Sequence, residues 1–171
     1  MQLEKVKLLT AGAKDLSLLT DLANEMRNEK DVDYFEVLLQ LQKEGLRTVY
    51  IAKNISDYVG YCLVNWSPKY GLYKRLNIPE IQDLNVLPKF RRRGIGKAMI
   101  EHCEKVVKKR GFKHIGIGVG LDASFGSAQR LYVKMGYVPD GNGVTYDRIN
   151  VRSGEMRPID DDLSLMLVKD I

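Results

Sequence analysis

The sequence has few of the residues on which metal sites and disulfide frameworks depend. Its 171 residues include two cysteines and two histidines. Cys62 and Cys103 do not form the closely spaced ligand pairs of zinc sites, so we expect two reduced thiols in a reducing compartment. His102 and His114 are isolated, and we expect both at the surface. No metal is therefore predicted.

Long apolar runs are also missing. The N-terminal MQLEKVKLLTAGAK lacks the apolar core of a signal peptide, and no stretch approaches the ~20 residues that span a bilayer. We therefore predict a cytoplasmic protein with no membrane partner. Repeats, low-complexity segments and long linkers are absent too. The length then favours a single domain over residues 1–171.

Charge is present in quantity but is unevenly placed. The chain carries a formal net charge of +5. Between Lys89 and Lys113 stand ten basic residues against Glu101 and Glu104, so the rest of the chain is slightly acidic. A local excess of this kind indicates an anionic ligand or nucleic acid.

The spacing of apolar residues predicts a mixed α/β fold. Strands are expected at residues 6–10, 48–54, 58–66, 78–88, 114–120 and 163–168. Helices are expected at residues 15–26, 32–45, 96–109 and 127–136. The span 139–161 is expected to be mostly loop, with a weak strand near 144–146. The strand–helix–strand unit over 78–119 favours a parallel pair of strands.

RRRGIGKAM (91–99) stands where a predicted strand gives way to a predicted helix. A P-loop needs Ser or Thr after Lys97, but Ala98 stands there, which excludes that motif. A dinucleotide fingerprint needs a third glycine where Met99 stands, so that interpretation is weak. A solvated basic turn would explain the charge alone.

The glycines and the strand–helix junction favour an anion site over a solvated turn. Backbone N–H groups from about Arg92 to Lys97 would point at one spot, where the helix dipole adds partial positive charge. Gly94 and Gly96 have no side chain to keep a ligand away. We therefore predict a diphosphate site.

Two segments resemble motifs of one enzyme family. RRRGIG (91–96) resembles the Arg/Gln-x-x-Gly-x-Gly/Ala motif of the GNAT superfamily of acetyl-CoA-dependent N-acetyltransferases. LNVLPKF (84–90) is similar to its central strand and turn, and LYVKMGY (131–137) to its Leu-Tyr-x-x-x-Gly-Phe/Tyr segment. Chain length and element order also fit. The resemblance implies a central, mostly antiparallel sheet with a splayed parallel strand pair, flanked by helices.

The resemblance further implies acetyl-CoA as a co-substrate. Its pantetheine arm would pair with the main chain of Leu84, Asn85 and Val86, as an added strand does. Its pyrophosphate would be held by the amides of Arg91, Arg92, Arg93, Gly94, Ile95, Gly96 and Lys97. Where the family often has an Asn, this chain has Phe125, and Ser124 or Ser127 could supply the missing hydrogen bond.

The chemistry requires a base for the protonated amine and a proton donor for the thiolate that leaves. Tyr132 matches the family's tyrosine and is the implied donor. Glu80 matches a glutamate at the start of the same strand in several branches, and Asp83 is the second candidate base. Strand alternation does not choose between these two carboxylates, because a bulge would reverse it.

The amine acceptor is not identified by the sequence. Aromatic and acidic groups would suit a cationic amine, and the substrate-binding candidates are Asp33, Tyr34, Trp66 and Tyr70. A homodimer is possible. In the predicted strand 114–120, three alternate glycines leave one face bare, which would make room for a helix or for the coenzyme.

Two other functions compete with catalysis. A nucleic-acid module would need basic residues on one helix face with base-reading groups nearby. The basic residues of helix 96–109 are instead mixed with Glu101 and Glu104, so we predict no nucleic-acid partner. A non-catalytic, acyl-CoA-binding regulatory protein of the same fold stays open.

Overall fold

A computed structural model describes residues 5–28 and 30–171. The chain divides into two compact units, and each is assembled from two stretches of sequence. The first comprises Met1–Trp66 with Ile81–Lys105, and the second comprises Ser67–Glu80 with Val106–Ile171.

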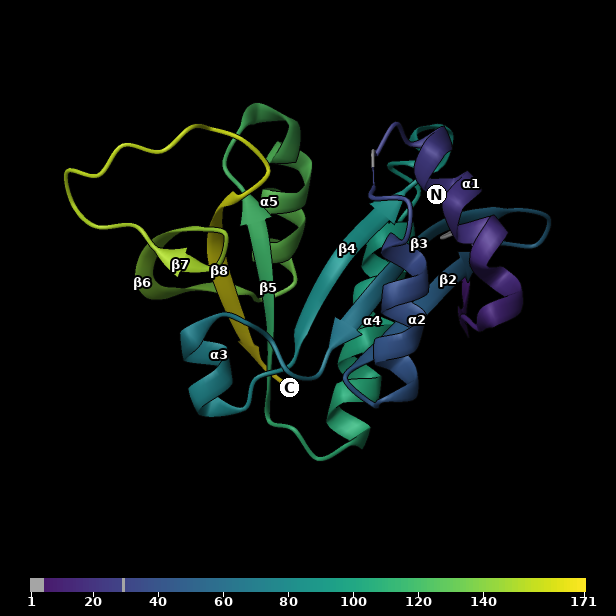
Figure 1. The fold of residues 1–171 in the computed structure, drawn as a ribbon, viewed down its shortest axis with the longest axis horizontal. Coiled ribbons are helices and arrows are strands. Elements are labelled where there is room, and N and C mark those ends of the chain that lie inside the picture. Colours follow the sequence, from purple (N-terminus) through teal and green to yellow (C-terminus); the bar gives the residue numbers. More distant parts are fainter. Residues whose placement is uncertain (1–4, 29) are drawn as a thin grey trace. The chain divides into compact units, whose positions relative to one another are not determined.

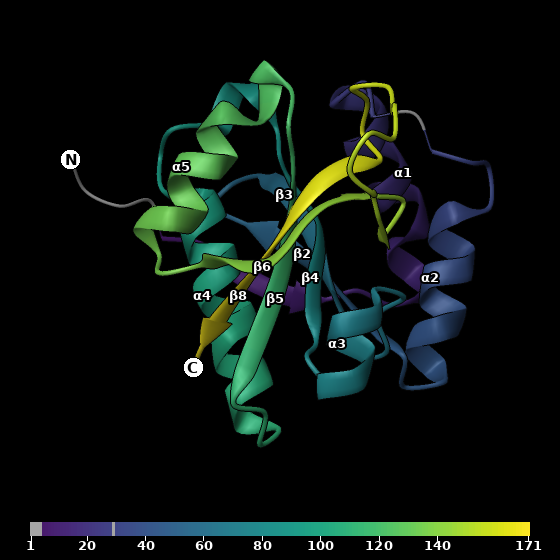
Figure 2. The same cartoon turned by 90° about the vertical axis from the view of Figure 1, so that its left-hand side faces the viewer.

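The first unit is built on four neighbouring strands. They follow the order β1 (Lys7–Thr10), β2 (Arg47–Lys53), β3 (Tyr58–Asn65) and β4 (Glu80–Val86). The pairs β1/β2 and β2/β3 are antiparallel. Figures 1 and 2 show α1 (Leu16–Glu25) and α2 (Tyr34–Lys43) on one face of these strands, and α4 (Ile95–Lys109) on the other. The 3-10 helices η1 (Ala13–Asp15) and η2 (Pro88–Phe90) precede α1 and α4.

Helices on both faces explain why the central strands of this unit are apolar throughout. Every residue of β3 after Tyr58 is buried, and so are the four residues 49–52 of β2. The helices bury residues at helical spacing: Leu19, Leu22 and Ala23 of α1, Phe35, Leu38 and Leu39 of α2, and Ile95, Met99, Ile100 and Cys103 of α4. This packing holds β4 and the start of α4 in place.

The second unit contains the strand order β5 (His114–Gly120), β8 (Leu163–Asp170), β6 (Val138–Tyr146) and β7 (Ile149–Asn150). Adjacent pairs in this order are antiparallel. Figure 2 shows α5 (Gly126–Lys134) on one face of these strands and α3 (Gly71–Leu76) on the other. The 3-10 helix η3 (Ala123–Phe125) leads into α5.

The predicted mixed α/β fold with mostly antiparallel strands is confirmed. The start of β4 belongs to the second unit, where the Gly116 N–H donates to the Pro79 carbonyl at 2.8 Å. Every predicted strand and helix is present, within a few residues of its predicted bounds.

The weak strand predicted near 144–146 is present, but the loop predicted over 139–143 is wrong. Strand β6 runs from Val138 to Tyr146, and β7 follows it after a two-residue turn. Strand β6 pairs with β8 at both ends, but the register shifts between Pro139 and Val144. The polar residues between those ends, DGNG, hid the strand from a search for apolar alternation. Helix α3 was missed because six residues are too few to show helical spacing.

The bare glycine face of β5 is filled by the protein's own side chains: aromatic rings at Gly116 and Gly120, and Met166 at Gly118. A Cβ added at Gly116 would lie 2.3 Å from the Tyr73 ring, and one at Gly120 would lie 2.4 Å from the Phe125 ring. Tyr73 comes from α3, so a helix uses part of this room. Phe125 has a packing role against Gly120, which accounts for an aromatic residue at that position.

None of the helices in residues 5–28 and 30–171 combines the length and apolar character needed to cross a membrane.

Candidate functional site

The segment between η2 and α4 forms a tight turn that ends at a helix N-terminus. Arg92 and Gly94 have φ values of +66° and +82°, and Ile95 is the first residue of α4. The Ala98 N–H donates to the Gly94 carbonyl at 3.0 Å and so begins the helical hydrogen-bond ladder. The first-turn amides before Ala98 have no carbonyl partner within the helix. These N–H groups, with the helix dipole, suit an anion.

Arginine side chains brace this turn from outside. Arg91 Nε donates to the Val86 carbonyl at 3.0 Å, and Arg93 Nη2 donates to the Lys89 carbonyl at 3.0 Å. The Arg93 guanidinium also lies 5.4 Å from the centre of the Phe90 ring. Arg91, Arg92 and Arg93 are all exposed. Exposed cations around a set of outward amides fit the diphosphate of a coenzyme.

Strand β4 departs from regular geometry at Asp83. Its φ of +50° lies in the left-handed region, which non-glycine residues seldom adopt. The irregularity interrupts the alternation of side chains, as a bulge does. Farther along β4, the backbone passes so close to β3 that a Cβ at Gly60 would lie 2.1 Å from the Asn85 carbonyl oxygen. Leu84, Asn85 and Val86 are each partly exposed.

The Asp83 carboxylate binds a cation and a hydroxyl at the same time. Lys30 Nζ lies 3.0 Å from Asp83 Oδ1, and the Tyr34 hydroxyl donates to Oδ2. The Lys30 ammonium also lies 4.5 Å from the centre of the Tyr34 ring. The side chains of Lys30 and Asp83 are each 19% exposed, so solvent reaches the pair. We call Lys30, Tyr34 and Asp83 the β4 carboxylate cluster.

Aromatic residues enclose this cluster on one side. The rings of Tyr34 and Phe35 meet edge to face at 5.2 Å, and those of Phe35 and Tyr61 at 5.4 Å. Burial is the main cause that raises the pKa of the Tyr34 hydroxyl, and the charge of Asp83 adds to it. The pKa of Tyr61 is raised by the same two causes, burial first. Both hydroxyls therefore stay protonated at neutral pH; that of Tyr34 donates to Asp83, and that of Tyr61 accepts from Asn28 Nδ2 at 3.2 Å.

Glu80, the first residue of β4, has a different environment from that of Asp83. Its side chain is fully buried, and its Oε1 accepts from Arg148 Nε at 3.1 Å and Nη2 at 2.9 Å. Arg148 lies in the two-residue turn between β6 and β7, where Asp147 and Arg148 have φ values of +48° and +66°. This partner was not predicted, because the turn falls in the span predicted to be mostly loop.

Tyr132 and Ser127 both lie on α5. Tyr132 is buried, and the centre of its ring lies 6.2 Å from that of Tyr137. Ser127 is exposed in the first turn of the helix.

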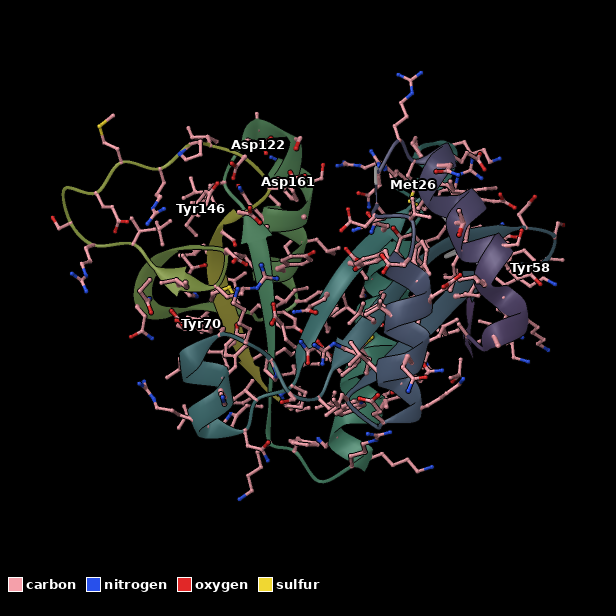
Figure 3. The ribbon with its side chains drawn as sticks, viewed as in Figure 1. Met26, Tyr58, Tyr70, Asp122, Tyr146 and Asp161 are labelled. Atoms are coloured by element: carbon pink, nitrogen blue, oxygen red, sulfur yellow. The ribbon has the colours of Figure 1, made fainter. Side chains whose placement is uncertain are left out.

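Of the predicted substrate-binding residues, Tyr34 is the one that reaches a candidate catalytic residue. Asp33 is exposed at the N-terminus of α2. Trp66 Nε1 donates to Thr48 Oγ1 at 2.9 Å. Tyr70, at the start of α3 (Figure 3), is buried and donates to Asp140 Oδ2 at 2.5 Å; burial first, then this bond, raises its pKa to about 12.

The cysteines and histidines build no metal centre. Cys62 and Cys103 are buried free thiols with their Sγ atoms 3.8 Å apart. His102 is not a surface residue as predicted: it is half-buried, edge to face with Tyr50 at 4.7 Å. His114 is exposed beside Asp170. Across residues 5–28 and 30–171, no three His, Cys, Asp or Glu side chains are grouped to hold a metal ion.

Sequence comparison identifies the family of the chain. The profile of the Acetyltransferase (GNAT) family matches residues 16–137, which include the 91–97 segment and Tyr132. The chain belongs to this family. The resemblance of the two motifs to GNAT enzymes is thereby confirmed.

A curated relative of this chain is described as an N-acetyltransferase. The chain is 34% identical over 95 residues to this uncharacterized N-acetyltransferase of Archaeoglobus fulgidus, a match covering 54% of this chain and 60% of the relative. The match thus spans less than two thirds of that protein.

Solved structures of low sequence identity show the same GNAT fold. One is a Salmonella typhimurium acetyltransferase that modifies the N-terminal serine of ribosomal protein L7/L12, with TM-score 0.72, 13% identity, and coverage of 97% of this chain and 95% of that one. Another is a GNAT acetyltransferase of Elizabethkingia anophelis with acetyl-CoA bound, with TM-score 0.64, 17% identity, and coverage of 97% and 98%.

Proposed function

We propose that this GNAT protein is an N-acetyltransferase that transfers the acetyl group of acetyl-CoA to a primary amine by direct attack in a ternary complex. The arrangement of residues 91–97 carries the proposal, because outward first-turn amides and exposed arginines suit a coenzyme pyrophosphate. A fold neighbour from Elizabethkingia anophelis binds acetyl-CoA, which supports the same ligand here.

Acetyl-CoA supplies an activated thioester, and the chain supplies the groups that hold it. In the proposed complex, the amides of Ile95, Gly96 and Lys97 bind the pyrophosphate. The main chain of residues 84–86 pairs with the pantetheine arm. Ser127 supplies the hydrogen bond that an Asn often gives in this family.

Of the two candidate bases, Asp83 is the one we propose. A base has to reach the amine directly or through one water molecule. The side chain of Asp83 is 19% exposed, whereas that of Glu80 is 0% exposed and is held by Arg148. In this assignment Asp83 accepts the proton of the amine, and Glu80 serves as the buried partner of Arg148.

Tyr132 is the proposed proton donor, on its match to the family's tyrosine. The amine nitrogen forms a bond to the thioester carbonyl carbon, the carbon–sulfur bond breaks, and the hydroxyl of Tyr132 protonates the departing thiolate. Tyr34 is retained as a substrate-binding residue because it touches Asp83. The roles of Asp33, Trp66 and Tyr70, a cytoplasmic location and a homodimer stay predictions.

An acceptor screen tests the proposal. Purified protein is mixed with acetyl-CoA and with amines, amino acids, polyamines, aminoglycosides or peptides, and release of free thiol is recorded. We expect release above the amine-free background for at least one acceptor class, and its loss in Tyr132→Phe. Calorimetry with acetyl-CoA provides the second readout. Coenzyme binding with no thiol release across the panel would favour the non-catalytic regulatory function instead.

A further inference from the structure

A cation already sits at the proposed base. The Lys30 ammonium lies 3.0 Å from Asp83 Oδ1 and 4.5 Å from the centre of the Tyr34 ring. A carboxylate and an aromatic face are the two groups that attract an ammonium most strongly from different sides. Lys30 belongs to the segment between α1 and α2, Tyr34 to α2 and Asp83 to β4, so three separate parts of the chain build one ammonium site.

The proposed function requires a substrate ammonium at this same carboxylate. We propose that Asp83 and Tyr34 form the acceptor subsite, that Lys30 occupies it until an acceptor displaces its ammonium, and that the acceptor is a primary ammonium on an unbranched methylene chain. This inference rests on the proposed function and names its substrate class.

The chemistry of Lys30 itself indicates the preferred ligand. Its unbranched four-carbon chain brings a primary ammonium both to Asp83 and over the face of the Tyr34 ring, so a ligand with the same unbranched chain and terminal ammonium can make the same two contacts. The Tyr34 hydroxyl donates to the second carboxylate oxygen and so leaves Oδ1 for the ammonium. A lysine side chain or an aliphatic diamine has the same chemistry.

The occupant can be displaced. Lys30 is partly exposed, and an ion pair that water reaches is weak because water screens it. The cation–π contact adds a contribution of similar size. Competition from Lys30 should therefore raise the KM of the acceptor by roughly 10-fold, the factor that corresponds to these two weak contacts together.

Removal of the ammonium tests the inference kinetically. Lys30→Met keeps an unbranched side chain without the charge, and Lys43→Met changes an exposed lysine of α2 as the matched control. At saturating acetyl-CoA, we expect KM for 1,5-diaminopentane and for Nα-acetyl-lysine amide to fall about 10-fold in Lys30→Met, with kcat within about 2-fold. Lys43→Met should match the parent protein. An unchanged or raised KM in Lys30→Met overturns the inference while leaving the proposed function intact.

A labelling experiment without acetyl-CoA separates the two proposals. The parent protein is treated briefly with an amine-reactive acetylating reagent, and labelling of Lys30 and Lys43 is read by mass spectrometry. We expect Lys30 to react more slowly than Lys43. The diamine also consumes the reagent and slows both reactions, so the readout is the ratio of Lys30 to Lys43 labelling in the same sample, and we expect 1,5-diaminopentane to raise this ratio. If the diamine leaves the ratio unchanged, the subsite assignment fails. If it releases Lys30 in a protein that transfers no acetyl group, the proposed function fails and the ammonium site stands.

Discussion

The 91–97 segment and the β4 carboxylate cluster lie in the same unit, but the first offers hydrogen-bond donors and the second offers an acceptor. The segment offers donors from consecutive main-chain amides at the start of α4. The cluster offers an acceptor, Asp83, whose two oxygens are bound by Lys30 and Tyr34. Main-chain donors are set by local backbone geometry alone. The acceptor site depends on side chains from three parts of the chain. One of these side chains, Lys30, occupies the site proposed for the substrate amine.

The largest effect should come from the acceptor side. Asp83→Asn removes the proposed base while keeping the size of the side chain, so kcat/KM should fall roughly 10²- to 10⁴-fold. The dissociation constant of acetyl-CoA should not change, because that ligand is assigned to the other region. Steady-state kinetics and calorimetry measure the two quantities. A loss of coenzyme binding equal to the loss of rate would break the division between the regions.

A variant of Glu80, the second carboxylate of β4, tests which of the two carboxylates is the base. Glu80→Gln takes a buried charge away from Arg148, so the free energy of unfolding should fall by about 3 kcal/mol. At a temperature where the variant is folded, kcat/KM should stay within about 3-fold of the parent value. Asp147→Asn, which breaks the exposed Lys69–Asp147 pair in the same turn, should cost at most about 1 kcal/mol. A 100-fold loss of rate in a folded Glu80→Gln protein would move the base to Glu80.

In the 91–97 segment, Gly94 can be compared with Gly45, a glycine of similar backbone conformation outside the segment. Gly94 and Gly45 have φ values of +82° and +77°, and a Cβ at Gly45 meets no atom within 4 Å. Alanine at either position should cost roughly 1 kcal/mol of stability through backbone strain. Gly94→Ala should also weaken acetyl-CoA binding by about 10-fold, because the amides that follow it tilt. Equal coenzyme affinity in both variants would show that the turn is not the pyrophosphate site.

The smallest effect should come from His102 in α4, a residue that belongs to neither region. Burial first, and then the charge of Lys105, lowers the pKa of His102 below 6.5. The folded protein therefore binds fewer protons here than the unfolded chain, and stability is lost as pH falls through about 6.5. His102→Phe should make the urea midpoint fall less between pH ~7.5 and ~5.5, without changing the kinetics. A steeper fall in the variant would contradict the assigned direction.

Much of the fold follows from local patterns. The apolar spacing of α1, α2 and α4 and the apolar runs of β2, β3 and β5 identify these elements directly, because each buries residues at the period of its own structure. The first part of β6, residues 138–143, and helix α3 escaped prediction for the opposite reason. Strand β6 is held by backbone pairing with β8 at its two ends, and the polar residues 140–143 between them carry no apolar signal.

The predicted site likewise has one part that a local sequence pattern identifies and another part that it does not. RRRGIGK is readable because a strand, a glycine turn and a helix start are contiguous in sequence, and contiguous amides need no distant partner. Asp83 and Glu80 could not be ranked from alternation, since the positive φ of Asp83 interrupts it. Their partners, Lys30 and Arg148, stand 53 and 68 residues away in sequence, so no spacing rule connects them.

The sequence by itself therefore determined the family and the fold class and led to the proposal of residues 91–97 as the coenzyme segment, because each depends on contiguous residues with a characteristic period or motif. The tertiary structure decided which carboxylate is sealed and which is open to solvent. It also placed the Lys30 ammonium and the Tyr34 ring against Asp83. Burial and ion pairing depend on residues brought together from distant parts of the chain, and a linear pattern holds no record of those contacts.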